Sequence, residues 1–150
     1  MKLTDFIHPE EIRLDLESDT KYDAIHEMVD LLRLEKKAQE ILLNLLRKRE
    51  ELGSTGIGSG VALPHSRSLV VDRLRVAFGR KLSGIDFGSV DGQPVRFLFL
   101  LVAPPVEVSN QYLPVLGRIA QFCKNADNLE RLARVTSVDQ FMDALTAADV

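Results

Sequence analysis

The sequence has very little cysteine: among its 150 residues Cys123 is the only one, and tryptophan is absent. A single cysteine cannot form a disulfide within the chain and cannot supply a CxxC-type metal site. We therefore expect a protein of a reducing compartment, in which Cys123 packs as a small apolar side chain. A chain of this length needs no cross-link, since folding buries about 68–70% of the surface that its unfolded state exposes.

An excess of positive charge and a long apolar segment are also missing. Lys and Arg total 19 against 22 Asp and Glu, a net charge of −3, whereas nucleic-acid binding is typical of a basic surface. The longest apolar run, 97–103, is shorter than the roughly 20 residues that cross a bilayer. The N-terminus has no signal-peptide core. We therefore predict a cytoplasmic protein that neither binds nucleic acid nor inserts into a membrane.

Apolar residues recur with helical spacing in the first and last thirds of the chain. Residues 22–32 and 38–46 each form one apolar helical face, and Asp19 or Thr20 is expected to cap the first of these helices. A third apolar stripe extends over residues 112–123. Two further pairs have the spacing of helix caps: Asp127 with Glu130, and Ser137 with Gln140. Both ends of the chain are therefore predicted to be helical.

The middle third has the period of a β-sheet. Alternation over residues 74–78 predicts a half-buried strand, whereas residues 95–103, apolar except at Arg96, predict a strand that is covered on both faces. Turn-forming sequences at 86–88 and 91–94 lie between them. Helices before and after a strand-rich centre predict one layered α/β domain, extending over residues 1–150, in which helices cover a sheet.

A cluster of glycines precedes the residue on which the functional interpretation depends. Four of the nine glycines lie within residues 53–60, directly before Val61-Ala62-Leu63-Pro64-His65. Glycine adopts positive φ readily, so the cluster is expected to shape a loop, and residues 61–63 a short strand. Pro64 is expected to end the strand pairing and to restrict the backbone beside His65. We therefore predict that His65 lies at a strand end.

A histidine held in this way is suited to accept a phosphoryl group. Neutral imidazole is a nucleophile near physiological pH, and phosphoryl transfer asks a protein mainly for positioning and charge stabilisation. Arg49 and Arg67, on either side of the glycine-rich segment, are candidate partners for phosphoryl oxygens. The composition alone leaves two alternatives open, namely a structural loop with a satisfied histidine and an ordinary solvated arginine at position 67.

Other interpretations of the glycines fail on spacing. A dinucleotide fingerprint would need a third glycine where Leu63 stands, and a P-loop would need lysine after Gly58, where the sequence has serine. The G-x-S-x-G elbow of hydrolases is also missing. A hydrolase that uses another serine (Ser54, Ser59 or Ser66) lacks a recognisable base and acid.

Residues 55–65, Thr-Gly-Ile-Gly-Ser-Gly-Val-Ala-Leu-Pro-His, resemble the active-site signature of phosphotransferase-system enzyme IIA domains of the fructose/mannitol type, including the nitrogen-regulatory branch. The resemblance covers most of the chain and implies a central mixed sheet flanked by helices on both faces. It implies that His65 accepts a phosphoryl group from HPr or its nitrogen-branch counterpart, and that Arg49 helps to neutralise that group. An enzyme IIB or a regulatory target protein would follow downstream. No metal or organic cofactor is implied.

One position departs from the family pattern. The family has a helix that begins His-Leu-x-x-Leu, whose histidine assists phosphoryl transfer, and here the segment is Tyr112-Leu113-Pro114-Val115-Leu116. Tyrosine offers a hydroxyl donor but no cation at neutral pH. Tyr112 therefore either donates a hydrogen bond to phosphorylated His65 or only packs at the head of its helix. The alternative to a phosphocarrier is a regulatory binding module with slow or absent phosphorelay, and a free-standing regulatory protein is favoured over a permease component.

Overall fold

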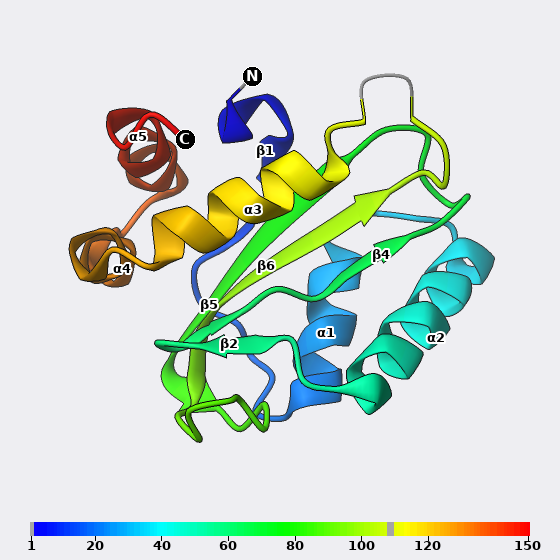
Figure 1. Cartoon of the computed structure of the whole chain (residues 1–150), viewed down its shortest axis with the longest axis horizontal. Coiled ribbons are helices and arrows are strands. Elements are labelled where there is room, and N and C mark those ends of the chain that lie inside the picture. The colour runs from blue at the N-terminus through cyan, green and yellow to red at the C-terminus, as the bar shows by residue number, and fades with distance from the viewer. Residues whose placement is uncertain (1, 108–109) are drawn as a thin grey trace.

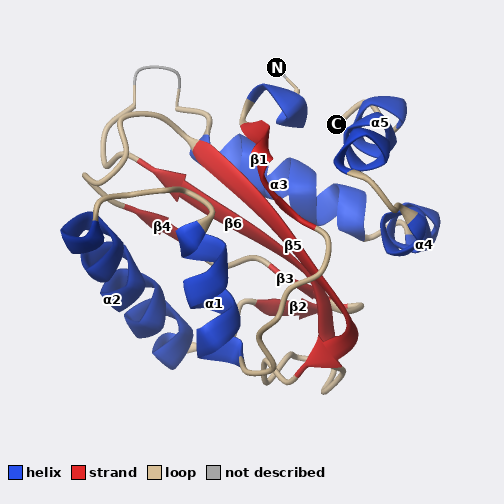
Figure 2. Ribbon diagram, turned by 180° about the vertical axis from the view of Figure 1, so that it is seen from behind, coloured by secondary structure: helices blue, strands red, loops and turns tan. Residues whose placement is uncertain are grey.

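The computed structural model of the chain describes residues 2–107 and 110–150, and it places a mixed β-sheet between two groups of helices (Figures 1 and 2). One face of the sheet is covered by α1 (Lys21–Asp30) and α2 (Lys36–Leu52). The other face is covered by α3 (Tyr112–Cys123), α4 (Ala126–Arg134) and α5 (Val138–Ala147), with the short 3-10 helix η1 (Leu3–Asp5) beside them. The predicted α/β fold, with helices on both faces of a central mixed sheet, is confirmed.

In the described part of the chain, six strands form the sheet: β1 (Ile7–Arg13), β2 (Gly56–Gly58), β3 (Val61–Ala62), β4 (His65–Arg67), β5 (Arg75–Ile85) and β6 (Val95–Ala103). Their order is β1-β5-β6-β3-β2, and β4 pairs with β6 beyond the end of β3. The strands β5 and β6 are antiparallel, whereas β1 is parallel to β5 and both β3 and β4 are parallel to β6. Strands β3 and β4 therefore follow one another along the same edge of β6.

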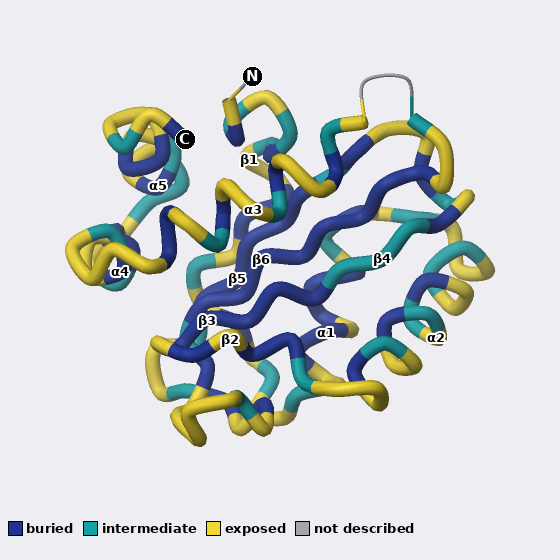
Figure 3. Tube along the Cα trace, viewed as in Figure 1, coloured by how far each residue is buried: buried dark blue, intermediate teal, exposed yellow. Residues whose placement is uncertain are grey.

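The core has two halves, one on each face of β6. Phe97, Phe99 and Leu101 belong to the half under α3, α4 and α5, whereas Leu98 and Leu100 belong to the half under α1 and α2. The prediction that residues 95–103 form a strand covered on both faces is therefore confirmed, and Figure 3 shows the central strands buried along their length. Among the described residues, no helix has the length and apolar character that a bilayer-spanning segment requires.

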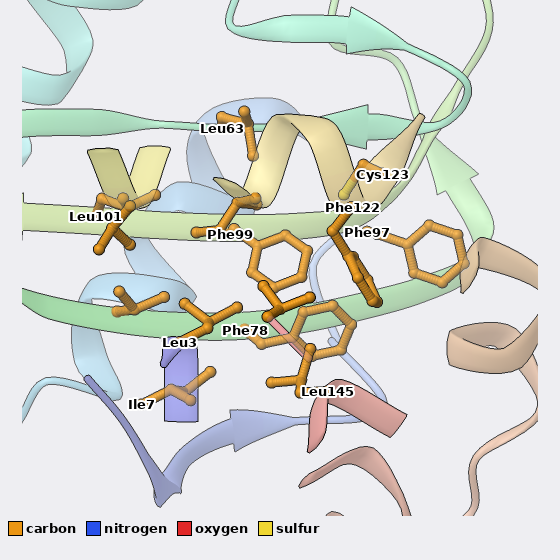
Figure 4. Close-up of a cluster of buried hydrophobic side chains, with 14 of the residues drawn as sticks. Leu3, Ile7, Leu63, Phe78, Phe97, Phe99, Leu101, Phe122, Cys123 and Leu145 are labelled. Atoms are coloured by element: carbon orange, nitrogen blue, oxygen red, sulfur yellow. The ribbon is translucent and has the colours of Figure 1, made fainter. Parts of the chain in front are cut away.

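Aromatic packing fixes the first half of this core. The Phe78 ring of β5 lies 4.9 Å from the ring of Phe99 and 4.3 Å from the ring of Phe141 in α5, measured between centroids. Figure 4 shows Phe78 among the side chains of several other elements, including Leu3 and Leu145. Offset or tilted aromatic pairs at such distances stabilise a core beyond the area that they bury. The C-terminal helix is thereby attached to the middle of the sheet.

The structure corrects the prediction for the strands at two places. The first third of the chain was predicted to be helical, but residues 7–13 form the edge strand β1, which pairs with β5 although it contains Pro9. Residues 74–78 were expected to be half-buried, but β5 continues to Ile85 and both Ala77 and Phe78 are fully buried. The reason is that β5 lies between β1 and β6, and its small residues on the second face allow α1 to pack closely on it.

The predicted helices are present, and their capping residues are partly different. Helix α1 begins after Thr20, as expected, but the Thr20 side chain makes no capping hydrogen bond. Helix α4 is capped by Asn125, whose side chain accepts a hydrogen bond from the amide of Asp127 at 2.9 Å, so the predicted cap at Asp127 was wrong. The cap at Ser137 is confirmed, because its hydroxyl accepts a hydrogen bond from the amide of Gln140.

A buried arginine connects the sheet to the C-terminal helices. Arg80 is 5% exposed, and its guanidinium donates hydrogen bonds to the carbonyl of Leu14 at 2.9 Å, of Leu132 at 3.0 Å and of Val135 at 2.7 Å. Since buried carbonyls need donors, the side chain joins β5 to the segment after β1 and to the α4–α5 connection.

We expect the substitution Arg80→Met to lower the free energy of unfolding by about 2–4 kcal/mol, because it leaves buried carbonyls without their donor. Urea unfolding measures this change. The matched control is Arg131→Met, which removes an exposed arginine of α4 and is expected to change the same quantity by less than about 0.5 kcal/mol. Equal stability of the two variants would contradict a role for Arg80 in joining the layers.

Candidate functional site

The glycine-rich segment forms a small hairpin at the edge of the sheet. Strands β2 and β3 pair antiparallel, and the turn between them contains Gly60 at φ +79°. Gly56 lies so close to Ser89 that a Cβ atom at position 56 would meet the Cβ atom of Ser89 at 2.9 Å. The glycines therefore allow a turn with positive φ and a close approach of the 86–94 loop. This agrees with the prediction that the glycine cluster shapes a loop.

A buried ion pair holds the start of this hairpin. The carboxylate of Glu50, at the end of α2, is 4% exposed and accepts a hydrogen bond from the amide of Thr55 at 3.0 Å. The ammonium group of Lys21, from α1, lies 2.9 Å from the same carboxylate oxygen. Thr55 in turn accepts a hydrogen bond from the amide of Leu63 at 3.0 Å. Both helices of this face thereby fix the chain two residues before His65.

His65 lies at a break between two strands. The prediction of a strand end was correct for β3, which stops at Ala62, but pairing with β6 resumes at once because His65 is the first residue of β4, opposite Leu101. Pro64 does not end the ladder, because it lacks only a donor and its carbonyl accepts a hydrogen bond from the amide of Leu101 at 3.0 Å. The backbone of His65 is therefore held by the central strand of the sheet.

The imidazole has a defined tautomer. Its Nδ1 atom lies 2.6 Å from the carbonyl oxygen of Leu63, and since a carbonyl can only accept, the proton is on Nδ1. The Nε2 atom of the neutral ring then carries the lone pair. His65 is half-buried, so its ring is held by the backbone but is not enclosed. This geometry is that of an oriented nucleophile.

Tyr112 faces this ring from the first residue of α3. The centroids of the His65 and Tyr112 rings are 6.2 Å apart, and the ring planes are inclined by 55°. Tyr112 is 6% exposed and also packs in the core half under α3, so the packing expected of this residue is present. Burial raises the pKa of its hydroxyl, and the positive charges of Arg67 and Arg49 partly offset the rise. The phenol is therefore a neutral hydrogen-bond donor at physiological pH.

The two candidate arginines have different surroundings. The guanidinium carbon of Arg67 lies 4.5 Å from the centroid of the Tyr112 ring, and Arg67 donates a hydrogen bond to the carbonyl of Pro104 at 2.9 Å. Arg49, in the last turn of α2, donates a hydrogen bond to the carbonyl of Gly53 at 2.8 Å. Both charges act on the Tyr112 hydroxyl. The Arg67 side chain is 32% exposed and lies over the Tyr112 ring, so it is only partly solvated.

Glu107 was missed by the sequence analysis. Its carboxylate accepts a hydrogen bond from the amide of Tyr112 at 2.8 Å and lies 3.8 Å from a guanidinium nitrogen of Arg67. The carboxylate thus caps the start of α3 and balances part of the local positive charge. His65, Tyr112 and Arg67 thus lie together, and the charge of Arg49 also acts on Tyr112, so this region is a candidate for binding an anion.

The model of one protein family matches residues 5–148, nearly the whole chain: "Phosphoenolpyruvate-dependent sugar phosphotransferase system, EIIA 2". A fructose-specific EIIABC component of Bacillus subtilis is 33% identical over an alignment of 155 positions, which covers 99% of this chain but only 24% of that protein. A nitrogen regulatory protein of Bradyrhizobium diazoefficiens is 35% identical over 133 residues, covering 88% of this chain and 86% of that one. The chain therefore spans about a quarter of the first relative and most of the second.

Solved structures have the same fold. The nitrogen regulatory protein IIA-Ntr of Neisseria meningitidis superposes with a TM-score of 0.85 at 31% identity, covering 94% of this chain and 97% of that one. The enzyme IIA for mannitol of Escherichia coli, in its complex with phosphorylated enzyme IIB, has a TM-score of 0.75 at 24% identity, covering 92% and 95%. The mixed sheet with its five helices is therefore an arrangement known from enzyme IIA structures.

Proposed function

The chain belongs to the phosphoenolpyruvate-dependent sugar phosphotransferase system EIIA 2 family, and on this premise we propose that it is a phosphocarrier whose acceptor is Nε2 of His65. Residues 1–150 would act as one enzyme IIA domain. The observation that carries the proposal is the 2.6 Å contact between Nδ1 of His65 and the Leu63 carbonyl. It keeps the proton on Nδ1 and leaves the Nε2 lone pair for phosphorus.

The transfer needs no separate proton acceptor. The Nε2 lone pair forms the new bond to phosphorus, while the bond between phosphorus and the donor histidine breaks and its electron pair returns to the donor ring. The His65 ring becomes positively charged and keeps its Nδ1 proton, which the Leu63 carbonyl stabilises. Arg49 and Arg67 are proposed to neutralise the phosphoryl oxygens, since guanidinium groups match them in charge and geometry.

We assign Tyr112 a positioning role in addition to its packing. Its neutral hydroxyl would donate a hydrogen bond to a phosphoryl oxygen on His65, where the family pattern has a histidine. Tyr112→Phe keeps the ring, so phosphorylation is expected to slow by about two- to tenfold, the value of one hydrogen bond. Rapid-quench kinetics with phosphorylated HPr measure the rate of phosphorylation. An unfolding measurement on the variant is the control for any loss of packing.

Tyr112→His is expected to speed transfer to an acceptor, because it restores a side chain that can carry a proton at neutral pH. The rate of phosphoryl loss to an enzyme IIB would be compared with wild type. If Tyr112→Phe and Tyr112→His both keep the wild-type rates, this position has no part in transfer.

The proposed donor is HPr or its nitrogen-branch counterpart. The proposed acceptor is an enzyme IIB or a regulatory target protein. Support comes from the relatives, which include a nitrogen regulatory protein and a fructose-specific component, and from the mannitol enzyme IIA, which was solved with phosphorylated enzyme IIB. Both donor and acceptor dock transiently, as expected of signalling encounters with small interfaces.

Incubation with phosphoenolpyruvate, enzyme I and HPr, followed by intact mass measurement, tests the proposal. The expected result is a gain of one phosphate that is lost in acid and that depends on all three additions. Nitrogen-15 NMR of the labelled protein should assign the phosphate to Nε2. An unlabelled protein, or a phosphate that survives acid, would contradict a phosphohistidine carrier.

A regulatory binding module is the second candidate, favoured by Tyr112 in the place of a catalytic histidine. The apolar side chains of Leu69, Val106 and Leu113 are exposed in the segments after β4, after β6 and at the start of α3. A phosphoryl group on His65 would add nearly two negative charges and change the affinity for a partner there. Partner binding that persists without any label on His65 would favour this module over the carrier.

A further inference from the structure

A cavity of about 470 Å³ lies at the end of α3 that is opposite Tyr112, between α4, the β2–β3 turn and the start of β6. Figure 1 shows α3 extending from the neighbourhood of β4 to α4, so the two ends of this helix serve different regions. The floor of the cavity is apolar and consists of Phe97, Cys123, Leu129 and Ala133. Its volume is within the range of small-molecule sites, about 300–1,000 Å³.

An irregularity in the strand pairing turns Arg96 toward this cavity. The amides of Arg96 and Phe97 both donate to the carbonyl of Gly60 in the β2–β3 turn, at 2.8 and 2.9 Å, and the register between β5 and β6 shifts between Arg80 and Ile85. The alternation of β6 breaks at this point: Val95 and Leu98 both pack in the core half under α1 and α2. Arg96 therefore shares with Phe97 the α3–α4 face and lines the cavity.

The charge of Arg96 is unmatched. Its Nε atom is buried without a hydrogen-bond partner, and its guanidinium carbon lies 5.5 Å from the centroid of the Phe97 ring. Within residues 2–107 and 110–150, neither Arg96 nor Lys124 forms an ion pair, whereas Arg134 at the rim pairs with Glu130. The wall of the cavity thus carries positive charge that no acidic side chain of the described residues balances, which favours an anionic group there.

The thiol of Cys123, in the floor of the cavity, carries no negative charge that would repel an anion. Burial raises the pKa of the Cys123 thiol to about 12, so this group is neutral at physiological pH. The only acidic side chain that lines the cavity among the described residues, Glu130, is already paired with Arg134. The cavity thus combines an apolar floor with two available positive charges, Arg96 and Lys124.

We propose that this cavity binds a small organic anion with an apolar body, whose charged group pairs with Arg96 and Lys124 while its body lies on Phe97 and Leu129. The site is separate from the proposed phosphoryl site. Phe97 precedes Leu101, the residue opposite His65, by four positions on β6, a separation of about 13 Å along a strand.

Titration of the nitrogen-15-labelled protein with 4-phenylbutyrate, followed by NMR, tests the site. Amide shifts that saturate at Phe97, Cys123, Lys124 and Leu129 are expected. The neutral analogue 4-phenylbutyramide has the same apolar body, and it should bind at least about tenfold more weakly because it has no negative charge to pair with Arg96 and Lys124. Inorganic phosphate, which lacks the body, should also bind more weakly.

Variants assign the binding to these side chains. Arg96→Gln and Lys124→Gln are each expected to weaken 4-phenylbutyrate binding about tenfold while the NMR spectrum stays that of a folded protein. The matched control Arg131→Gln, an exposed arginine of α4 that does not line the cavity, should leave the affinity unchanged. Equal binding of the acid and its amide, shifts centred elsewhere, or an unaffected Arg96→Gln variant would overturn the site. The phosphorylation of His65 is measured separately and does not depend on this outcome.

Discussion

A His65→Gln variant is expected to gain no phosphate when it is incubated with phosphoenolpyruvate, enzyme I and HPr. Glutamine places an amide group near the position of the imidazole Nε2 atom, but an amide nitrogen has no nucleophilic lone pair at neutral pH. Intact mass measurement should show the phosphorylated species for wild type and only the unmodified mass for the variant. The whole of the proposed function depends on this difference.

His26→Gln is the matched control for this experiment. His26 is an exposed histidine of α1 whose Nε2 atom lies 3.7 Å from the carboxylate of Asp30, and it is not part of the glycine-rich segment. Full labelling of this variant is expected. Phosphate on the His65→Gln protein would mean that another residue is the acceptor, and loss of label from both variants would point to damage that is not specific to His65.

Removing the charge of Arg49 or Arg67 should have the second largest effect on the phosphorylation of His65. Arg49→Gln and Arg67→Gln are each expected to slow phosphorylation about ten- to a hundredfold, because a charge-assisted hydrogen bond to a phosphoryl oxygen is worth roughly 1.5–3 kcal/mol. The double variant should be slower than either single variant. Rapid-quench measurement with phosphorylated HPr gives the rates.

The control for the arginine series lies on the same helix as Arg49. Arg47 is exposed, and its guanidinium carbon lies 5.5 Å from the Tyr22 ring, away from His65. Arg47→Gln removes the same net charge from the protein and should keep the wild-type rate at physiological salt, where distant charges are screened. If Arg49→Gln and Arg47→Gln react equally fast, long-range attraction of the donor accounts for any effect and Arg49 does not hold the phosphoryl group.

Parts of the fold follow directly from local sequence. Residues 95–103 are so uniformly apolar that only a strand covered on both faces fits them, and the stripe over residues 112–123 matches α3 at both ends. Strand β1 was missed because it contains Pro9 and two glutamates, and because its stability comes from pairing with β5, more than sixty residues later in the chain. Non-local pairing of this kind leaves little trace in a single segment.

The candidate site likewise combines residues that the sequence predicts with contacts that it does not predict. The glycine-rich segment and the family signature predict His65 and Arg49 as site residues. The contacts of Arg67 with Tyr112 and Glu107 do not, because they join the end of β4 to a loop and a helix that lie about forty residues away. The irregular pairing at Arg96 could not be predicted either, since the sequence shows only one charged residue in an apolar strand and not the carbonyl of Gly60 that accepts hydrogen bonds from two amides.

The short strand β2 leaves one polar group at the margin of the sheet to be satisfied by a side chain. Because β2 begins only at Gly56, no strand of the described residues pairs with Leu63 on this side, although its amide donates to the carbonyl of Thr55. An unpaired carbonyl at such a margin is a group to which the strand of another molecule can bond. Here the Leu63 carbonyl accepts a hydrogen bond from the imidazole of His65. The ring that is proposed to carry the phosphoryl group therefore also satisfies this carbonyl.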